Sequence, residues 1–273
     1  MVTNTPTSDL PSLLDIAIAA AVDAGRAILD VYSSAFAVEH KDDRSPLTLA
    51  DKRSHEIIAA RLAAKDAGGL PLLSEEGRNI PFEERKRWGL FWLVDPVDGT
   101  KEFIKRNGEF TVNIALVRQN RPVLGVIYVP VRDTLYYAAE GLGAWRLDKA
   151  SGDHARPGRA DRLPVPGGPH RPFTAVASRS HLSPETEAFL RELGARHGRM
   201  ETLSAGSSLK FCLIAEGRAD VYPRFGPTME WDTAAGHAIV VEAGGMVVTS
   251  TDRVELLYNK EDLHNPWFIA GRA

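Results

Sequence analysis

The 273-residue sequence predicts a mixed α/β fold in two parts. Three observations predict it. Helical and then strand-like apolar patterns fill residues 1–148, and strand and helix patterns alternate over residues 173–273. Residues 149–172 are rich in proline, glycine and arginine and show little apolar periodicity, which marks them as a connection between two subdomains.

The N-terminal subdomain is expected to pack two helices on an antiparallel sheet. Apolar residues recur at helical spacing over 12–34 and again over 48–66, where two glycines end the pattern. Short β-rich runs with tight turns then predict a meander of neighbouring strands. These strands are expected at 91–94, 110–117, 123–129 and 135–139. The charged run 83–87 is expected to form a solvated helical turn.

The C-terminal subdomain is expected to be an α/β layer because its strand and helix patterns alternate. Strands are expected at 173–177, 200–203, 220–222, 246–249 and 267–270. Helices are expected at 184–197, 207–216 and 233–243.

Charge and composition exclude several classes of protein. The sequence has 33 Lys and Arg against 36 Asp and Glu, so it lacks the positive excess of a general nucleic-acid binder. One cysteine excludes an intramolecular disulfide and a Cys-rich zinc site. The longest stretch without Asp, Glu, Lys or Arg, Pro122 to Val131, is shorter than the roughly 20 residues of a spanning helix. The N-terminus has no basic flank before its apolar run, so no secretory signal is expected. A cytoplasmic location is expected, with peripheral association with an inner membrane left open.

The most informative segment is Asp95–Thr100, which follows a buried-strand pattern. Proline cannot extend a strand ladder, so the chain is expected to turn there, with Asp95 and Asp98 on either side of the Val97 carbonyl. Carboxylates with a carbonyl form an oxygen-only ligand set, which suits Mg²⁺ rather than Zn²⁺. Gly99 would let an anionic ligand approach the backbone amides. Taken alone, the Asp-Gly pair is equally consistent with an ordinary turn.

Three other acidic segments each have an ordinary structural explanation. Glu75 lies in Ser-Glu-Glu-Gly after an apolar run, which is typical of a solvated loop. Asp232 lies in Glu-Trp-Asp-Thr-Ala-Ala-Gly, where it is expected to be a helix N-cap. Thr48 and Asp51 are similar to a capping box. An N-cap carboxylate points off the helix end, so capping is compatible with binding a ligand.

Together these four segments resemble the inositol monophosphatase family of Mg²⁺-dependent, lithium-sensitive phosphatases. The family pattern is A-D, then E-E, then D-P-x-D-G-T, then W-D-x-A-A-G, and all four occur here in that order. The run 98–114, with Lys-Glu-Phe after Asp-Gly-Thr, is similar to the bacterial CysQ type of 3′(2′),5′-bisphosphate nucleotidase, as are 205–211 and 222–224. The resemblance implies a layered αβαβα sandwich with its metal site between two subdomains.

The resemblance also implies a set of ligands for two to three Mg²⁺ ions. Glu75, Asp95 and the Val97 carbonyl would hold one ion, and Asp95, Asp98 and Asp232 would hold a second. A third, weaker ion would lie near Glu75 and help to position water. Most of these ligands fall in the N-terminal subdomain.

Catalytic and substrate-binding roles are implied in the same way. Thr100 would orient the attacking water, and Asp51 would accept a hydrogen bond from the Thr100 hydroxyl and act as general base through that relay, with Glu75 as the third catalytic residue. Substrate contacts are implied for Gly99, Thr100, Lys101, His181, Ser207, Ser208, Lys210, Arg224 and Asp232. For Lys210 and Arg224 the alternative is plain surface solvation, and for His181 it is a surface position at the start of a loop.

The predicted activity is Mg²⁺-dependent hydrolysis of the 3′-phosphate of 3′-phosphoadenosine 5′-phosphate to give AMP and phosphate. The sulfated nucleotide 3′-phosphoadenylyl sulfate is a second candidate substrate, and the role would be in sulfate assimilation. An inositol or sugar (bis)phosphatase is the alternative. A non-catalytic binding module is disfavoured because no acidic ligand is missing. No nucleic-acid partner is expected, and the oligomeric state is not predicted.

Overall fold

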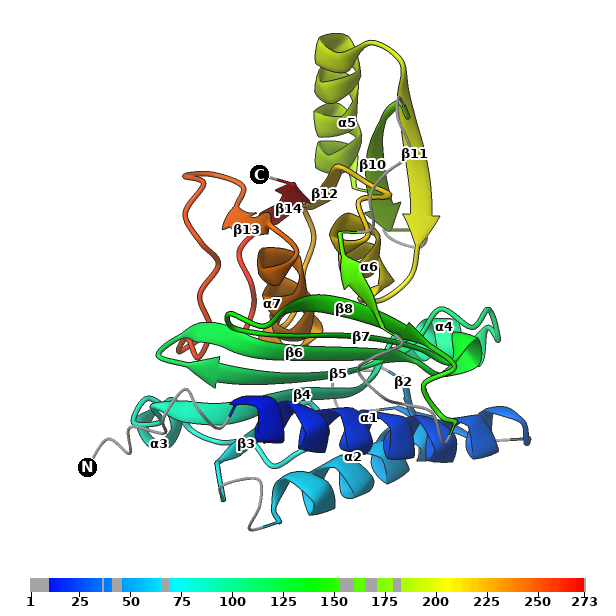
Figure 1. The fold of residues 1–273 in the computed structure, drawn as a ribbon, viewed down its shortest axis with the longest axis vertical. Helices are drawn as coiled ribbons and strands as arrows, with labels where there is room; N and C mark the ends of the chain where they lie inside the picture. Colours follow the sequence, from blue (N-terminus) through cyan, green and yellow to red (C-terminus); the bar gives the residue numbers. More distant parts are fainter. Residues whose placement is uncertain are drawn as a thin grey trace.

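The computed structural model of the chain describes residues 10–35, 37–40, 46–64, 69–152, 160–164, 171–178 and 183–272. Its elements stack as two helices, a large sheet, two helices, a smaller sheet and one further helix (Figure 1). The predicted αβαβα sandwich is therefore confirmed.

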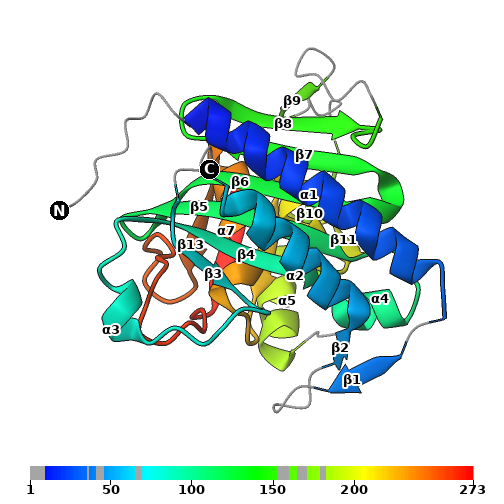
Figure 2. The ribbon, with the colours of Figure 1, turned by 90° about the horizontal axis from the view of Figure 1, so that it is seen from below.

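The first two layers come from the N-terminal half. Helices α1 (Leu10–Tyr32) and α2 (Leu49–Leu62) lie side by side across one face of a seven-stranded sheet (Figure 2). The sheet order is β3-β4-β5-β6-β7-β8-β9, antiparallel except for the β3–β4 pair. Its strands are β3 (Leu72–Ser74), β4 (Leu90–Asp98), β5 (Thr111–Arg118), β6 (Arg121–Val129), β7 (Thr134–Ala139), β8 (Gly143–Asp148) and β9 (Asp161–Leu163). The smaller elements are β1 (Val38–His40), β2 (Pro46–Thr48), α3 (Phe82–Arg85), α4 (Thr100–Ile104) and a 3₁₀ turn at Pro130–Arg132.

The remaining layers come from the C-terminal part. The second sheet has the order β11-β10-β12-β14-β13 and mixes parallel and antiparallel pairs. Its strands are β10 (Phe173–Ser178), β11 (Met200–Ala205), β12 (Val221–Arg224), β13 (Gly245–Thr249) and β14 (Phe268–Arg272). The helices are α5 (Pro184–His197), α6 (Leu209–Ala215) and α7 (Ala234–Glu242), with a 3₁₀ turn at Glu230–Asp232 before α7.

The large sheet is covered on both faces, which explains its continuous apolar runs. In β4, Trp92 and Val94 join the core beneath α1 and α2. Phe91 and Leu93 point the other way and join the core formed with α6 and α7. Alternate residues thus serve two different cores from one strand.

Gly125 of β6 lets α7 sit directly on the sheet. A Cβ built at Gly125 would lie 2.3 Å from the Ala235 carbonyl oxygen, closer than any real contact. Because α7 begins directly after the Glu230–Asp232 turn, this close approach also fixes where Asp232 lies relative to the sheet.

Several sequence expectations need correction. Strands β8 and β9 were not predicted, and β9 lies inside the 149–172 connection, where it pairs with β8 and extends the first sheet. The remainder of that connection at 153–159 and 165–170 lies outside the described residues. The charged run 83–87 does contain a helical turn, and its residues are exposed as predicted except for Arg85, which is only 3% exposed. Its guanidinium is buried because it meets polar groups from residues 259–261.

Candidate active site

Five carboxylates line one cavity of about 280 Å³ between the two sheets, and four of them come from the predicted acidic segments: Glu75, Asp95, Asp98 and Asp232. Glu75 directly follows β3, where its backbone N–H donates to the Val94 carbonyl at 3.1 Å. That bond places the end of β3 beside the end of β4, which carries the first two aspartates. The predicted meeting of the acidic segments is therefore present in the structure.

The turn expected at Pro96 is a bulge within a continuing strand. β4 runs on to Asp98, and its pairing with β5 shifts register between Asp95 and Asp98. The Asp95 carboxylate accepts the Val97 N–H at 3.1 Å within this bulge. A bulge tolerates proline where a regular ladder does not, so the chain need not leave the sheet.

Asp98 is held by hydroxyl and amide donors. Its Oδ2 accepts from Ser208 at 2.8 Å, from Asn113 at 3.3 Å and from Thr111 at 3.4 Å. The Ser208 hydroxyl also lies 2.8 Å from the Asp232 carbonyl oxygen. Ser208 thus lies between Asp98 of β4 and the backbone of Asp232. Asn113 and Thr111 were not predicted to be near the site. Their one signal was polar residues within the apolar run 110–117.

Asp232 is not the N-cap of α7. It is the last residue of the 3₁₀ turn, and its Oδ2 accepts the Met229 N–H at 2.9 Å. The N-cap is Thr233, which makes no side-chain cap bond. The Asp232 carboxylate therefore caps its own turn backward while lining the cavity.

The acidic groups strongly oppose one another's ionisation. Burial, followed by repulsion from Glu75, Asp98 and Asp232, raises the pKa of Asp95 well above its usual range. Burial and repulsion from Asp98 raise the pKa of Asp232 to about 8. A side-chain hydrogen bond that the protonated Asp95 carboxyl donates to Glu75 raises the pKa of Asp95 further. Divalent cations would remove this penalty, and oxygen ligands of this kind fit Mg²⁺.

The carboxylates alone do not complete the coordination sphere of a metal ion. In the part of the chain that the structure describes, no group of three or more acidic, histidine or cysteine side chains is arranged ready to hold a metal ion. The Val97 carbonyl, solvent and the substrate would have to complete the coordination. The chemistry of the donor set fits Mg²⁺, which usually keeps several water ligands in proteins.

The side chain of Asp51 joins the start of α2 to Thr100. Its Oδ2 accepts from the Thr48 N–H at 2.7 Å and the Thr48 hydroxyl at 2.6 Å, and Ala50 N–H donates to the Thr48 hydroxyl at 3.1 Å. The predicted capping box is therefore present. The other oxygen, Oδ1, lies 3.2 Å from the Thr100 hydroxyl, which is also 3.3 Å from the Val97 carbonyl. One carboxylate can thus cap the helix and face the site.

Gly99 adopts a backbone conformation that favours glycine, with φ of 95°. A Cβ there would meet the Ser207 hydroxyl at 2.1 Å. The Ser207 hydroxyl lies 2.8 Å from the Asp98 carbonyl and 2.6 Å from the Glu109 carbonyl. The helical turn expected after Gly99 is present as α4. The Ser207 hydroxyl donates its proton to these backbone oxygens.

Lys210 and Arg224 are two of the cationic side chains that line the same cavity. Lys210 is 5% exposed, and its Nζ donates to the Ser207 carbonyl at 2.6 Å and lies 5.4 Å from the Tyr222 ring centre. Burial lowers its pKa to about 8. Surface solvation is thus wrong for Lys210. Arg224 donates through Nη2 to the Pro227 carbonyl at 2.9 Å, and its buried Nε has no partner within the described residues.

Lys101 also lines the cavity, whereas His181 lies outside the described residues. Sequence reasoning did not single out several other lining residues. These are Glu102, Gly206, Phe211, Tyr222, Thr228 and Thr233. Glu102 and Tyr222 did stand beside predicted contacts, in Lys-Glu-Phe and Tyr-Pro-Arg.

Comparison with known proteins identifies the family. The model of the inositol monophosphatase family matches residues 9–270. The chain belongs to the inositol monophosphatase family. The predicted resemblance is confirmed by this match.

Relatives within the family include nucleotidases. The chain is 47% identical over 248 residues to 3′(2′),5′-bisphosphate nucleotidase CysQ of Salmonella typhimurium, covering 90% of this chain and 94% of that protein. It matches the crystal structure of CysQ from Bacteroides thetaiotaomicron with a TM-score of 0.86 and 50% identity, over 95% and 96% of the two chains. An inositol monophosphatase from Anabaena is more distant, with a TM-score of 0.72 and 25% identity over 97% and 92% of the chains. In the described residues, no helix has the length and apolar character needed to cross a membrane.

Proposed function

We propose that this chain is a Mg²⁺-dependent phosphatase that hydrolyses the 3′-phosphate of 3′-phosphoadenosine 5′-phosphate to AMP and phosphate. 3′-Phosphoadenylyl sulfate would be a second substrate, because the groups that differ lie at the 5′ end. The role would be removal of a by-product of sulfate assimilation in the cytoplasm. One observation supports a bisphosphate substrate above all: the cavity brings the four proposed ligand carboxylates together with Lys210 and Arg224.

The carboxylates would hold two to three ions. Glu75, Asp95 and the Val97 carbonyl would bind the first, Asp95, Asp98 and Asp232 the second, and a weaker third would lie near Glu75. When bound, Mg²⁺ would neutralise the charge of the phosphate and acidify coordinated water. Without such cations, four carboxylates would repel a phosphate, so the site's own charge argues for metal dependence.

A proton path leads from the cavity through Thr100 to Asp51. In this proposal the Thr100 hydroxyl accepts a hydrogen bond from the attacking water and donates its own proton toward Asp51 Oδ1, 3.2 Å away. Water attacks phosphorus as the bond to the ribose 3′-oxygen breaks. The proton of the water passes through Thr100 to Asp51, the 3′-oxygen takes a proton from solvent, and the products are AMP and phosphate. In this relay Asp51 is the base, and Oδ1 takes the proton because Thr48 already donates two hydrogen bonds to Oδ2.

The remaining phosphate would be bound by cationic and backbone groups. Lys210, Arg224 and Lys101 line the cavity and supply positive charge. The backbone at Gly99 offers close approach at the start of α4. Ser207 and Ser208 would act by holding Asp98 and the surrounding backbone, and His181 stays a proposed contact to the nucleoside.

The test compares phosphate release at saturating Mg²⁺ from 3′-phosphoadenosine 5′-phosphate and from inositol 1-phosphate. We expect the nucleotide to be preferred at least a hundredfold in kcat/KM, which corresponds to about 3 kcal/mol of transition-state discrimination. Equal rates, or a preference for inositol 1-phosphate, would favour the inositol or sugar phosphatase alternative. Absence of release from both would reject the phosphatase proposal.

A further inference from the structure

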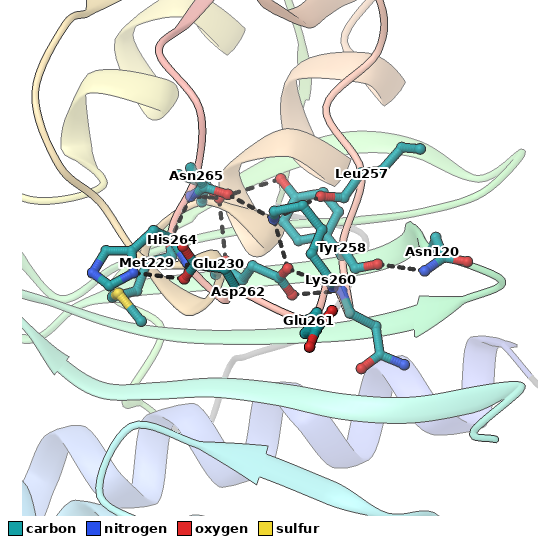
Figure 3. Close-up of polar contacts among 12 residues, drawn as sticks. Asn120, Met229, Glu230, Leu257, Tyr258, Lys260, Glu261, Asp262, His264 and Asn265 are labelled. Atoms are coloured by element: carbon teal, nitrogen blue, oxygen red, sulfur yellow. Dashed lines mark hydrogen bonds and ion pairs between the residues drawn. The ribbon is translucent and has the colours of Figure 1, made fainter. Parts of the chain in front are cut away.

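Glu230 is a buried carboxylate two residues before Asp232 that the proposed mechanism does not use. Its side chain is 0% exposed. It accepts the N–H of Asn259 at 2.5 Å, the N–H of Lys260 at 2.9 Å and the Lys260 ammonium at 2.6 Å (Figure 3). A buried carboxylate needs such compensation, so Glu230 and Lys260 stabilise each other's position.

Residues 257–265, which we name the strap, also hold both flanks of the Asp232 turn (Figure 3). Before the turn, the Asn265 amide donates to the Met229 carbonyl at 2.7 Å. After the turn, the same amide lies 3.0 Å from the Thr233 hydroxyl. The Glu230 N–H donates to the Leu263 carbonyl at 3.0 Å. The turn therefore depends on the strap for its backbone partners as well as for its charge partner.

The opposite side of the strap is attached to the N-terminal subdomain. Arg85 of α3 donates to the Asn259 side-chain oxygen at 3.0 Å and to the Glu261 carbonyl at 2.7 Å. The Asn259 amide donates back to the Arg85 carbonyl at 2.8 Å. Tyr258 N–H donates to the Asn120 carbonyl, at the β5–β6 turn, at 3.0 Å. The strap thus connects the subdomain of Asp95 and Asp98 with the turn that carries Asp232.

We propose that Glu230 and Lys260 are positioning residues that set Asp232 against Asp95 and Asp98 for metal binding. This inference rests on the proposed metal-dependent function. Asp232 needs such support because Asp98 repels its carboxylate when no cation lies between them. Among the described residues, Ser208 contacts both: its one hydroxyl proton serves Asp98 Oδ2 or the Asp232 backbone oxygen, and neither contact holds the Asp232 carboxylate. A loosened turn could therefore relax away from Asp98 and lose the geometry of a shared ligand.

The experiment measures binding of Mn²⁺ alone, by electron paramagnetic resonance, to the full chain without substrate. Glu230→Gln keeps the shape and one of the two acceptor oxygens, removes the charge that holds Lys260, and places its NH2 group against the N–H donors of the other oxygen. We expect the Mn²⁺ Kd to rise at least tenfold, and hydrogen exchange of residues 229–233 to accelerate. With nucleotide, kcat at fixed Mg²⁺ should fall at least tenfold while KM changes less than threefold.

Glu216→Gln is the matched control. Glu216 is also buried, at 3% exposure, and accepts from the Tyr136 hydroxyl at 2.7 Å and from Arg146 at 3.1 Å. It lies at the end of α6, and none of these bonds involves the Asp232 turn. This variant should lower the melting temperature while leaving the Mn²⁺ Kd within twofold of the wild-type value.

Lys260 provides a second test if Glu230→Gln does not fold. Lys260→Gln should weaken Mn²⁺ binding tenfold, and Lys260→Arg should restore it to within threefold. If the Glu230 or Lys260 variants melt earlier yet keep the wild-type Mn²⁺ Kd, the residues are merely structural and the inference is rejected. A wild-type protein that binds Mn²⁺ but releases no phosphate overturns only the proposed function. A wild-type protein that binds no Mn²⁺ overturns both.

Discussion

His237 in α7 should make the folded protein lose stability in mild acid. Its ring is 1% exposed, and Nδ1 lies 3.0 Å from the Tyr258 hydroxyl. The Tyr258 hydroxyl donates its proton to the Thr233 hydroxyl, 3.3 Å away. It can therefore only accept from His237, so the neutral His237 ring carries its proton on Nδ1. Burial, then repulsion from Arg121, lowers the pKa of His237 to about 3. Glu255, 4.0 Å from Nε2, is the nearby opposite charge and itself pairs with Arg121.

The sign and size follow from proton linkage. Below pH 6.5 the unfolded chain protonates this histidine and the folded protein does not, so each lower pH unit favours unfolding by about 1.4 kcal/mol. The contribution is fully present above pH 6.5 and is lost as the pH falls toward about 3. The loss reaches about 2 kcal/mol at pH 5 and about 4 kcal/mol at pH 3.

Urea unfolding of the wild type and of His237→Gln, from pH 7.5 to 4.5, tests this prediction. The wild type should lose stability faster than the variant as the pH falls, with the two slopes differing by about 1.4 kcal/mol per unit below pH 6. Parallel curves for wild type and His237→Gln would refute the claim that the buried ring stays neutral.

Three further predictions concern the site and its support. Asp51→Asn should lower kcat on the nucleotide by roughly 10²- to 10⁴-fold with Mn²⁺ binding retained, and a wild-type kcat would contradict the relay. Gly125→Ala should lower stability by about 1–3 kcal/mol in urea unfolding, since its Cβ would meet Ala235. Gly194→Ala, where nothing lies within 4 Å, is its control and should be neutral or stabilising. Lys210→Met should raise KM for the bisphosphate tenfold or more, and an equal effect with inositol 1-phosphate would show that Lys210 does not select a second phosphate.

Local patterns predicted most elements because local rules decide them. The proline after Ser183 starts α5, and its predicted bounds of 184–197 match the structure. The pairing of Thr48 with Asp51 requires only three residues of separation, so a capping box could be read directly. The apolar run 91–94 identified β4 because both faces of that strand are buried.

Features set by distant partners could not be predicted. Pro96 was expected to end a ladder, but β5 accommodates it in a bulge. Asp232 looked like an N-cap because that role is common at helix starts, whereas its acceptor is used by Met229. Arg85 was expected to be solvated because its partners lie 174 residues away in the sequence. No local pattern near Arg85 or near Asn259 indicates that the two residues pair. Glu230 was missed for the same reason.

The separation between Arg85 and its partners also has a consequence for synthesis. At roughly 5–20 residues per second, a ribosome needs about 10–35 seconds to extend the chain from Arg85 to Asn259, a separation of 174 residues. Burial of the sheet face formed by Phe91 and Leu93 is also delayed. The helices that cover this face, α6 and α7, begin only at Leu209 and Ala234. A nascent N-terminal subdomain therefore exposes one apolar sheet face for many seconds, during which chaperone binding and aggregation compete with completion of the fold.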